Sequence, residues 1–322
     1  MAHPPVPTDV PPTADPTITP VAEGGARGYA ADLLTLTKPR IISLLLVTTA
    51  APMFVAGSPS WRLVLLVMVG GYLMAGGANA VNMYFDRDID EHMARTRLRP
   101  IPSGRLAAPA VLAFGILLAG AATALLAHFV NVLTATLALA GFYFYVLVYT
   151  RWLKRSTPHN IVIGGAAGAF PPLVGWAAVT GRIDLVAVYL FLIIFYWTPP
   201  HFWALALLKQ RDYGRAGVPM APLVWGERRT IDQMLWYTVI LCALTLLPVV
   251  FGAFGLIYLA SVVVLDALLL AGVIRVRFAT PRTVAAWSVY KFSLLYLALL
   301  FAAMAVDHHA APWLAGLTQR IP

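Results

Sequence analysis

Long apolar runs, separated by short polar connections, make up most of the chain. Each run has about 20 residues, the length that an α-helix needs to cross the hydrocarbon core of a bilayer. Apolar runs of this length predict membrane helices and not strands. We therefore predict an all-α polytopic membrane protein with nine transmembrane helices, over residues 41–57, 63–86, 107–128, 130–151, 160–180, 184–209, 232–252, 254–274 and 285–306.

The composition agrees with this prediction. Of the 322 residues, 60% are hydrophobic and only 11% are charged, whereas soluble domains have about 25% charged residues. The single cysteine, Cys242, excludes an intrachain disulfide and lies within an apolar run, where it is expected to pack as a small hydrophobic residue.

The N-terminal segment differs from the rest of the chain. Residues 1–27 contain seven prolines and three acidic residues, with no Lys or Arg before Arg27. This pattern is typical of neither a secretory signal nor a transit peptide, and it favours a bacterial plasma (inner) membrane over a mitochondrial one. We predict a disordered cytoplasmic tail over 1–27, a membrane domain over 28–307 and a short extracytoplasmic tail over 308–322.

Basic residues are concentrated in alternate connections. Of the 23 Lys and Arg residues, 19 lie before the first run or in the connections that follow the second, fourth, sixth and eighth runs. Lys and Arg in short loops stay preferentially in the cytoplasm. We therefore predict a cytoplasmic N-terminus, an extracytoplasmic C-terminus and a functional site near the cytoplasmic face. The net charge of +9 is explained by this topology and gives no reason to predict nucleic-acid binding.

A ladder of polar residues ends the second apolar run. Asn82, Asp86 and Asp90 are spaced by four residues, so on a helix they lie along one face and span about 12 Å, while Asp88 points the other way. Carboxylates one turn apart can share Mg²⁺, which prefers oxygen ligands and is usually completed by substrate phosphates and water. The ladder predicts a Mg²⁺ site that binds a diphosphate.

A second polar group ends the sixth run, in TPPHFWALALLKQRDYGRAGVPM. His201 and Asp212 lie on one helical face. The pair Pro199 and Pro200 is expected to break or kink the helix beside a cavity. His201 could contact a ligand or form a hydrogen bond to a neighbouring helix, and both interpretations remain open.

Basic clusters lie beside these helix ends. LTKPR contains Lys38 and Arg40, and YTRWLKRSTPHN contains Arg151, Lys154 and Arg155. Each cluster alone is typical of an interfacial anchor. Together with two aspartate-bearing helix ends, the clusters can neutralise the charge of a diphosphate.

Two charged residues lie deeper in the apolar runs. Asp266 in the eighth run and Lys291 in the ninth are at similar depth if these helices are adjacent and antiparallel. Because an unpaired charge at this depth is costly, we predict an ion pair between Asp266 and Lys291.

The ladder and the Arg95-Thr96 and Arg99-Pro100 pairs that follow it resemble the signature of the UbiA superfamily of intramembrane prenyltransferases. Further blocks resemble its haem-modifying branch, namely LTKPR, LKRSTPHNIVIGGAAGAFPPLVGWAAVTG, WTPPHFWALALL and DYGRAGVPM. The resemblance extends from about residue 34 to residue 306. One departure is that Asp212, flanked by Lys209 and Arg211, stands where many superfamily members have two or more aspartates, which weakens a symmetric second metal site.

The resemblance implies nine helices around a central cavity, a Mg²⁺ requirement, and transfer of farnesyl from farnesyl diphosphate to a vinyl group of haem B, giving haem O. Membrane lipid, haem A synthase and a terminal-oxidase assembly are the further partners it suggests. It places the metal at Asn82, Asp86 and Asp90. It assigns catalytic roles to Asp86, Asp90, Asp212 and Lys154, and substrate contacts to Asn82, Lys38, Arg40, Arg95, His201, Lys209, Tyr213 and Asn160.

Several alternatives remain open. The glycines of IGGAAGAF, with Pro171 and Pro172, could leave room for haem or could serve close helix packing. The ladder is also compatible with an aromatic acid or a quinone precursor as the prenyl acceptor. A transporter or channel could place carboxylates in a polar cavity, although it does not need an aspartate ladder beside several basic connections.

Overall fold

The computed structural model describes residues 26–318, with side chains described over 28–310. In this part of the chain all regular structure is helical, and nine segments are long and apolar enough to cross a membrane. They are α2 (Pro39–Ala56), α3 (Trp61–Phe85), α5 (Ala108–Phe129), the continuous segment Val132–Ser156, the segment Asn160–Thr180, α10 (Leu185–Leu208), α13 (Glu227–Val250), α14 (Leu256–Phe278) and α15 (Arg282–Thr318).

The nine predicted membrane helices are confirmed, and most of their ends differ from the predicted ones by only a few residues. The largest difference is at α15, which continues to Thr318 as one helix. The predicted tail over 1–27 lies almost entirely outside the described residues.

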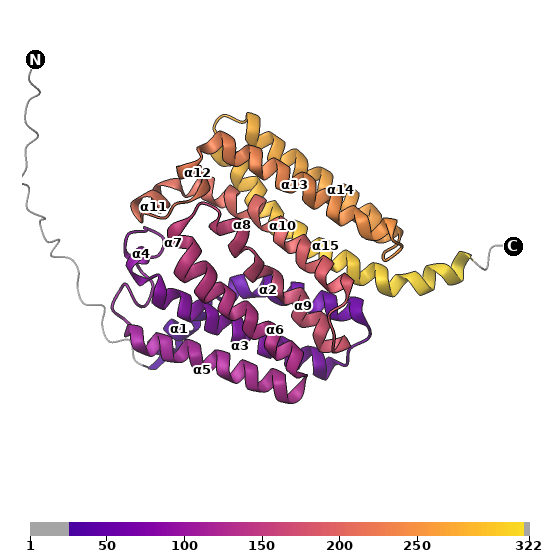
Figure 1. The fold of residues 1–322 in the computed structure, drawn as a ribbon, viewed down its shortest axis with the longest axis horizontal. Helices are drawn as coiled ribbons and strands as arrows, with labels where there is room; N and C mark the ends of the chain where they lie inside the picture. The colour runs from indigo at the N-terminus through magenta and orange to yellow at the C-terminus, as the bar shows by residue number, and fades with distance from the viewer. Residues whose placement is uncertain (1–25, 319–322) are drawn as a thin grey trace, which may run out of the picture.

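The spanning segments form a closed ring. Each packs against the next one along the chain, and α15 packs against α2. Contacts between α2 and α9 (Ala166–Thr180), and between α10 and α15, also cross the ring. In Figure 1, α3, α5 and α6 (Val132–Tyr143) form the lower part of the bundle, and α13 and α14 form the upper edge.

Short helices gather at one end of this bundle, at the left of Figure 1. They are α4 (Arg87–Glu91), α7 (Lys154–Ser156), α11 (Gln210–Arg215) and α12 (Ala221–Val224). A further helix, α1 (Ala26–Thr37), precedes the first span and packs on α3. These helices are too short or too polar to stand out as apolar runs, so hydrophobic patterning did not predict them.

The fourth span changes its helical type near that end. After α6, residues Phe144–Leu153 form a π-helix, η1, and α7 completes the span. In a π-helix the backbone N–H groups bond to carbonyls five residues earlier, and such segments are frequent at functional sites. The change of register alters which side chains of this span face α3.

The paired prolines do not interrupt the sixth span. α10 continues as a helix through Pro199 and Pro200, so of the expected break or kink, the break does not occur. α10 packs on α9, α13 and α15, and neighbours of this kind allow membrane helices to tolerate proline.

Glycines of the fifth span bring neighbouring elements close together. A Cβ atom on Gly164 would collide with the ring of Tyr149, and one on Gly175 would collide with the carbonyl oxygen of Thr49. Gly168 is different, because no heavy atom lies within 4 Å of the position that its Cβ would take. Close packing therefore explains Gly164 and Gly175, which leaves Gly168 as the open position.

The deep charges in α14 and α15 do not pair with each other. Asp266 accepts hydrogen bonds from Thr245 Oγ1 and from Tyr296 Oη, both at 2.7 Å. Lys291 is exposed, and its ammonium lies 5.7 Å from the centroid of the Trp287 ring one turn away. The predicted ion pair is therefore wrong, because two hydroxyl groups satisfy the carboxyl group and Lys291 faces outward.

Candidate functional site

The polar ladder crosses the junction between α3 and α4 without losing its helical spacing. The backbone N–H of Asp86 donates to the carbonyl of Asn82, and that of Asp90 donates to the carbonyl of Asp86. Asn82, Asp86 and Asp90 are all buried, at 4%, 1% and 2% exposure. The Asp88 side chain is 61% exposed and pairs with Arg155 at 2.7 Å, which lowers the Asp88 pKa to about 2. This confirms the prediction that Asn82, Asp86 and Asp90 share one helical face and that Asp88 points the other way.

Asp86 has one satisfied carboxylate oxygen and one that is unsatisfied. Its Oδ2 accepts from Lys154 Nζ at 2.6 Å and from Asn82 Nδ2 at 2.8 Å. Its Oδ1 is buried without a hydrogen-bond partner among the described residues, although Arg155 approaches to 4.0 Å. An orphaned carboxylate oxygen of this kind is a suitable ligand for a cation.

Lys38 reaches the ladder from the junction between α1 and α2. Its Nζ donates to Asn82 Oδ1 at 3.1 Å. The residue has φ 55°, in the left-handed region, which a non-glycine residue adopts at a cost and mostly at functional sites. Burial lowers the pKa of the Lys38 ammonium to about 7, with the nearby Arg99 guanidinium adding to the effect.

Asp90 is held by an arginine that the sequence-based assignments do not include. Arg99 Nη1 donates to Asp90 Oδ2 at 2.6 Å. Thr96 Oγ1 also donates to the Asp90 carbonyl at 2.9 Å. Arg99 follows the ladder in the Arg99-Pro100 pair, so the motif already contained the signal that would have identified it.

The connection between α3 and α5 (residues 86–107) meets the connection between α10 and α13 (residues 209–226) at this end of the bundle. Arg95 Nη2 donates to Tyr213 Oη at 3.2 Å, and the guanidinium lies 5.4 Å from the Tyr213 ring centroid. Asn160 is fully buried and donates to the carbonyls of Thr157 at 2.7 Å and Pro219 at 3.5 Å. Arg95 and Tyr213 thus join these two connections, and Asn160 ties the second of them to the short connection that follows the fourth span.

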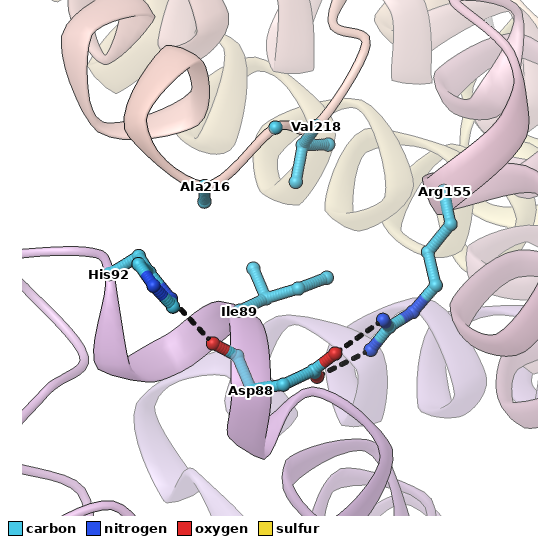
Figure 2. Close-up of a pocket in the computed structure, with 7 residues that line it drawn as sticks. Asp88, Ile89, His92, Arg155, Ala216 and Val218 are labelled. Carbon is cyan, nitrogen blue, oxygen red and sulfur yellow. Dashed lines mark hydrogen bonds and ion pairs between the residues drawn. The ribbon is translucent and has the colours of Figure 1, made fainter.

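A pocket of about 240 Å³ lies between α4 and the segment that follows α11. Figure 2 shows Asp88 and Arg155 paired on one side of it, with Ala216 and Val218 opposite. The remaining lining residues are Ile89, His92 and Gly217. The lining includes Asp88 and neither of the ladder aspartates, so this pocket is on the outward face of α4.

His201 forms a hydrogen bond to the neighbouring helix α15. Its Nδ1 lies 2.7 Å from Ser293 Oγ, and its ring stacks between Trp197 and Tyr290 at centroid distances of 4.4 and 4.9 Å. Ser293 Oγ donates its one proton to the Tyr290 carbonyl at 2.8 Å. With that proton on the carbonyl, Ser293 Oγ would accept from His201 Nδ1–H, and the lone pair would be on Nε2.

The other predicted residues are not part of this hydrogen-bonded cluster. Arg40 is exposed, whereas Lys209 and Asp212 are half-buried. None of the three forms a side-chain hydrogen bond or ion pair with a residue that the structure describes. Thr150, which bonds to Asn82, does belong to the cluster, and the assigned set does not include it. Arg155, which approaches Asp86 to 4.0 Å and pairs with Asp88, is also outside that set.

The site fits a metal that is completed by its substrate. Within the described residues, no group of three or more His, Cys, Asp or Glu side chains could hold a metal ion. Mg²⁺ commonly binds through one or two carboxylates plus substrate phosphates and water. Asp86 and Asp90 meet that requirement, but the amide oxygen of Asn82 is already bonded to Lys38.

Fold and site together define an all-helical, multi-pass membrane protein with a buried cluster of carboxylates and basic side chains at one end of its bundle. Comparisons with known proteins make this assignment more specific. The model of the UbiA prenyltransferase family matches residues 44–299, and the chain belongs to that family.

Curated relatives share more than half of the aligned residues. The protoheme IX farnesyltransferase of Roseiflexus castenholzii is 55% identical over 278 residues, which are 86% of this chain and 52% of that protein. The protoheme IX farnesyltransferase of Symbiobacterium thermophilum is 55% identical over 279 residues, covering 86% of this chain and 93% of that protein. The chain spans about half the length of the Roseiflexus relative and nearly all of the Symbiobacterium one.

Solved structures of low sequence identity share the fold. A digeranylgeranylglyceryl phosphate synthase aligns with a TM-score of 0.69 at 19% identity, over 87% of this chain and 99% of that chain. A UbiA homologue from Archaeoglobus fulgidus, bound to DMAPP and Mg²⁺, aligns with a TM-score of 0.62 at 17% identity. The alignment covers 85% of this chain and 99% of that chain.

Proposed function

We propose that this chain transfers the farnesyl group of farnesyl diphosphate to a vinyl group of haem B, with hydration, and so produces haem O. The buried cluster around Asp86 supports a prenyl diphosphate as the donor. The 55% identity to relatives named protoheme IX farnesyltransferase, one of which is covered over 93% of its length, supports haem as the acceptor.

The donor diphosphate binds at the ladder in this proposal. Asp86 and Asp90 would hold Mg²⁺ together with phosphate oxygens, and Mg²⁺ would offset the charge that grows on the departing diphosphate. Lys38, Lys154 and Arg99 surround the ladder with positive charge that the diphosphate can share. Preorganised charges of this kind stabilise developing charge without reorganisation during the reaction.

One bond breaks on the donor, and two new σ bonds replace the vinyl π bond of the acceptor. The bond between farnesyl C1 and the diphosphate oxygen breaks, and both electrons leave with the diphosphate. The terminal carbon of the haem vinyl group then bonds to C1. The cation left on the inner vinyl carbon takes up water and releases a proton, which gives the hydroxyethylfarnesyl group. An apolar, membrane-shielded site protects the allylic cation from bulk water before this step.

The remaining assignments concern residues that would contact haem and residues in or beside the connection between α10 and α13. His201 is proposed to contact haem, as an axial ligand or through a propionate. Asp212 is proposed as a further catalytic residue. Arg95, Lys209, Tyr213, Asn160 and Arg40 are proposed substrate contacts, of which Arg95 and Tyr213 join the connection between α3 and α5 to that between α10 and α13.

The proposed cellular setting follows from the distribution of basic residues. We place the protein in the plasma (inner) membrane, with a cytoplasmic N-terminus and the site near the cytoplasmic face. Membrane lipid surrounds it, and haem A synthase or a terminal-oxidase assembly is the proposed receiver of the product.

Mass spectrometry of extracted haem tests this proposal directly. Membranes that contain the protein are incubated with haem B, farnesyl diphosphate and Mg²⁺. The expected product is haem that has gained one farnesyl group and one hydroxyl group across the vinyl double bond, and membranes without the protein serve as the control. Unchanged haem, together with transfer of labelled farnesyl to an aromatic or quinone-precursor acceptor, would instead identify the rival prenyltransferase.

A further inference from the structure

Thr150 contacts the ladder from η1. It is fully buried. Its Oγ1 donates to the Tyr145 carbonyl at 2.9 Å, and it lies 3.0 Å from Asn82 Nδ2. A hydroxyl group has one proton and two acceptor lone pairs. Because the Tyr145 carbonyl can only accept, it takes that proton, and Thr150 Oγ1 must accept from the Asn82 amide.

The other partners of Asn82 require the same amide orientation. Lys38 Nζ donates to Asn82 Oδ1 on the side of the amide that faces away from Asp86. The Asp86 carboxylate accepts from Asn82 Nδ2 at 2.8 Å. Both N–H protons of the amide are therefore in use, one for Asp86 and one for Thr150. Asn82 connects three parts of the structure, and Thr150 is its link to the fourth span.

The π-helical register is what presents the Thr150 hydroxyl in this way. Helical threonines such as Thr136 and Thr198 donate to the carbonyl four residues earlier. Thr150 donates to the carbonyl five residues earlier, in keeping with the spacing of η1. Four residues further on, Lys154 contacts Asp86 from the end of the same span.

The geometry points to Thr150 as a positioning residue for the proposed reaction. By holding the Asn82 amide, Thr150 fixes the places of the Asp86 carboxylate and the Lys38 ammonium, which receive the metal and the diphosphate. This inference rests on the proposed function for its biological meaning. Thr150 itself touches neither metal nor substrate, and its effect passes through Asn82.

Four variants isolate the hydroxyl group. Thr150→Val removes it at nearly constant shape, Thr150→Ala removes it with less steric demand, and Thr150→Ser keeps it. Thr134→Val is the matched control, because Thr134 is fully buried in the same span and its Oγ1 has no hydrogen-bond partner in the described structure.

Two readouts are needed, one of them independent of turnover. The first is the Mg²⁺ concentration that gives half-maximal farnesyl transfer to haem. The second is the shift in melting temperature of the solubilised full chain, titrated with Mg²⁺ and inorganic pyrophosphate, since a ligand that binds the folded state raises its stability.

We expect Thr150→Val and Thr150→Ala to raise the half-saturating Mg²⁺ concentration about tenfold in both readouts, an effect typical of losing one buried hydrogen bond. The half-saturating Mg²⁺ concentration of Thr150→Ser should stay within about twofold of the wild-type value, and that of Thr134→Val should equal the wild-type value. In an Asn82→Ala background, Thr150→Val should add no further change, because the two residues act as one unit.

Three results would overturn the inference. They are unchanged Mg²⁺ dependence in both hydroxyl deletions, equal impairment in Thr150→Ser, and an undiminished Thr150→Val effect without Asn82. If Thr150→Val does not fold, Thr150→Ala is judged by the same criteria. A wild type that binds Mg²⁺ and pyrophosphate but makes no farnesylated haem would reject the proposed function and leave the positioning role intact.

Discussion

Asp86 is the residue on which the site depends most, because it is buried and yet keeps one oxygen without a partner. Its place on a shared face with Asn82 and Asp90 follows from helical spacing, which is a local property of the sequence. Its bond to Lys154 is not local, since the two residues are 68 positions apart and the bond depends on the register of η1. Helical spacing therefore identifies the ladder. Lys38 and Lys154 could be assigned to the site from the basic clusters and the family resemblance, but which ladder residue each one contacts depends on packing.

Asp86→Asn tests the ladder at the residue scale. The variant keeps the size of the side chain and removes the charge that Lys154 and a metal ion would share. We expect farnesyl transfer to fall by about 10²-fold or more, the usual cost of losing a preorganised electrostatic group. The measurement is the rate of haem O formation under saturating substrates.

Asp88→Asn is the matched control for that variant. Asp88 is two residues away, exposed, and paired with Arg155 on the opposite face of the helix. It should retain activity within a few-fold of the wild type. Equal losses in the two variants, or full activity of Asp86→Asn, would contradict the assignment of the ladder.

At the scale of elements, the nine spans could be predicted because each is a long apolar run, but the details of several could not. η1 has the composition of an ordinary apolar helix, so nothing local marks its π register. Depth along the helices alone predicts a bond between the Asp266 carboxyl group and Lys291. The helical rotation that turns Lys291 outward, and the hydroxyls of Thr245 and Tyr296, become visible only when α13, α14 and α15 pack.

The packing of α9 on α2 predicts that alanine substitutions at Gly175 and Gly168 have different effects on stability. Gly175→Ala places a methyl group against the carbonyl oxygen of Thr49, which belongs to the backbone and cannot rotate away. We expect it to destabilise the protein by about 1–3 kcal/mol, as overpacking commonly does. Thermal unfolding of the purified protein measures this change.

Gly168→Ala provides the comparison, because its added methyl group would meet no heavy atom within 4 Å. Alanine is favoured over glycine inside a helix by about 1 kcal/mol. This variant should therefore be at least as stable as the wild type. A Gly168→Ala protein that is as unstable as Gly175→Ala would show that helix contacts do not distinguish the two positions.

For the whole molecule, the distribution of basic residues predicts its orientation. An odd number of spans places the termini on opposite sides, and nine are found in the described chain. Alkaline phosphatase fused after residue 310 should be active, because it would be exported, while a green fluorescent protein fused there should stay dark. The opposite pair of signals would reverse the topology and place the ladder on the outer face.

The closed ring has a consequence for biosynthesis. α15 seals the ring against α2, and it is the last of these nine spans to leave the ribosome. Until then the faces of α2 and α10 that it covers must be occupied by lipid or by an insertion partner, since domains are generally completed in the order of synthesis. His201 gains its partner Ser293 only at this final step. A chain arrested before α15 would thus carry the whole aspartate ladder and still lack the helix that orients His201.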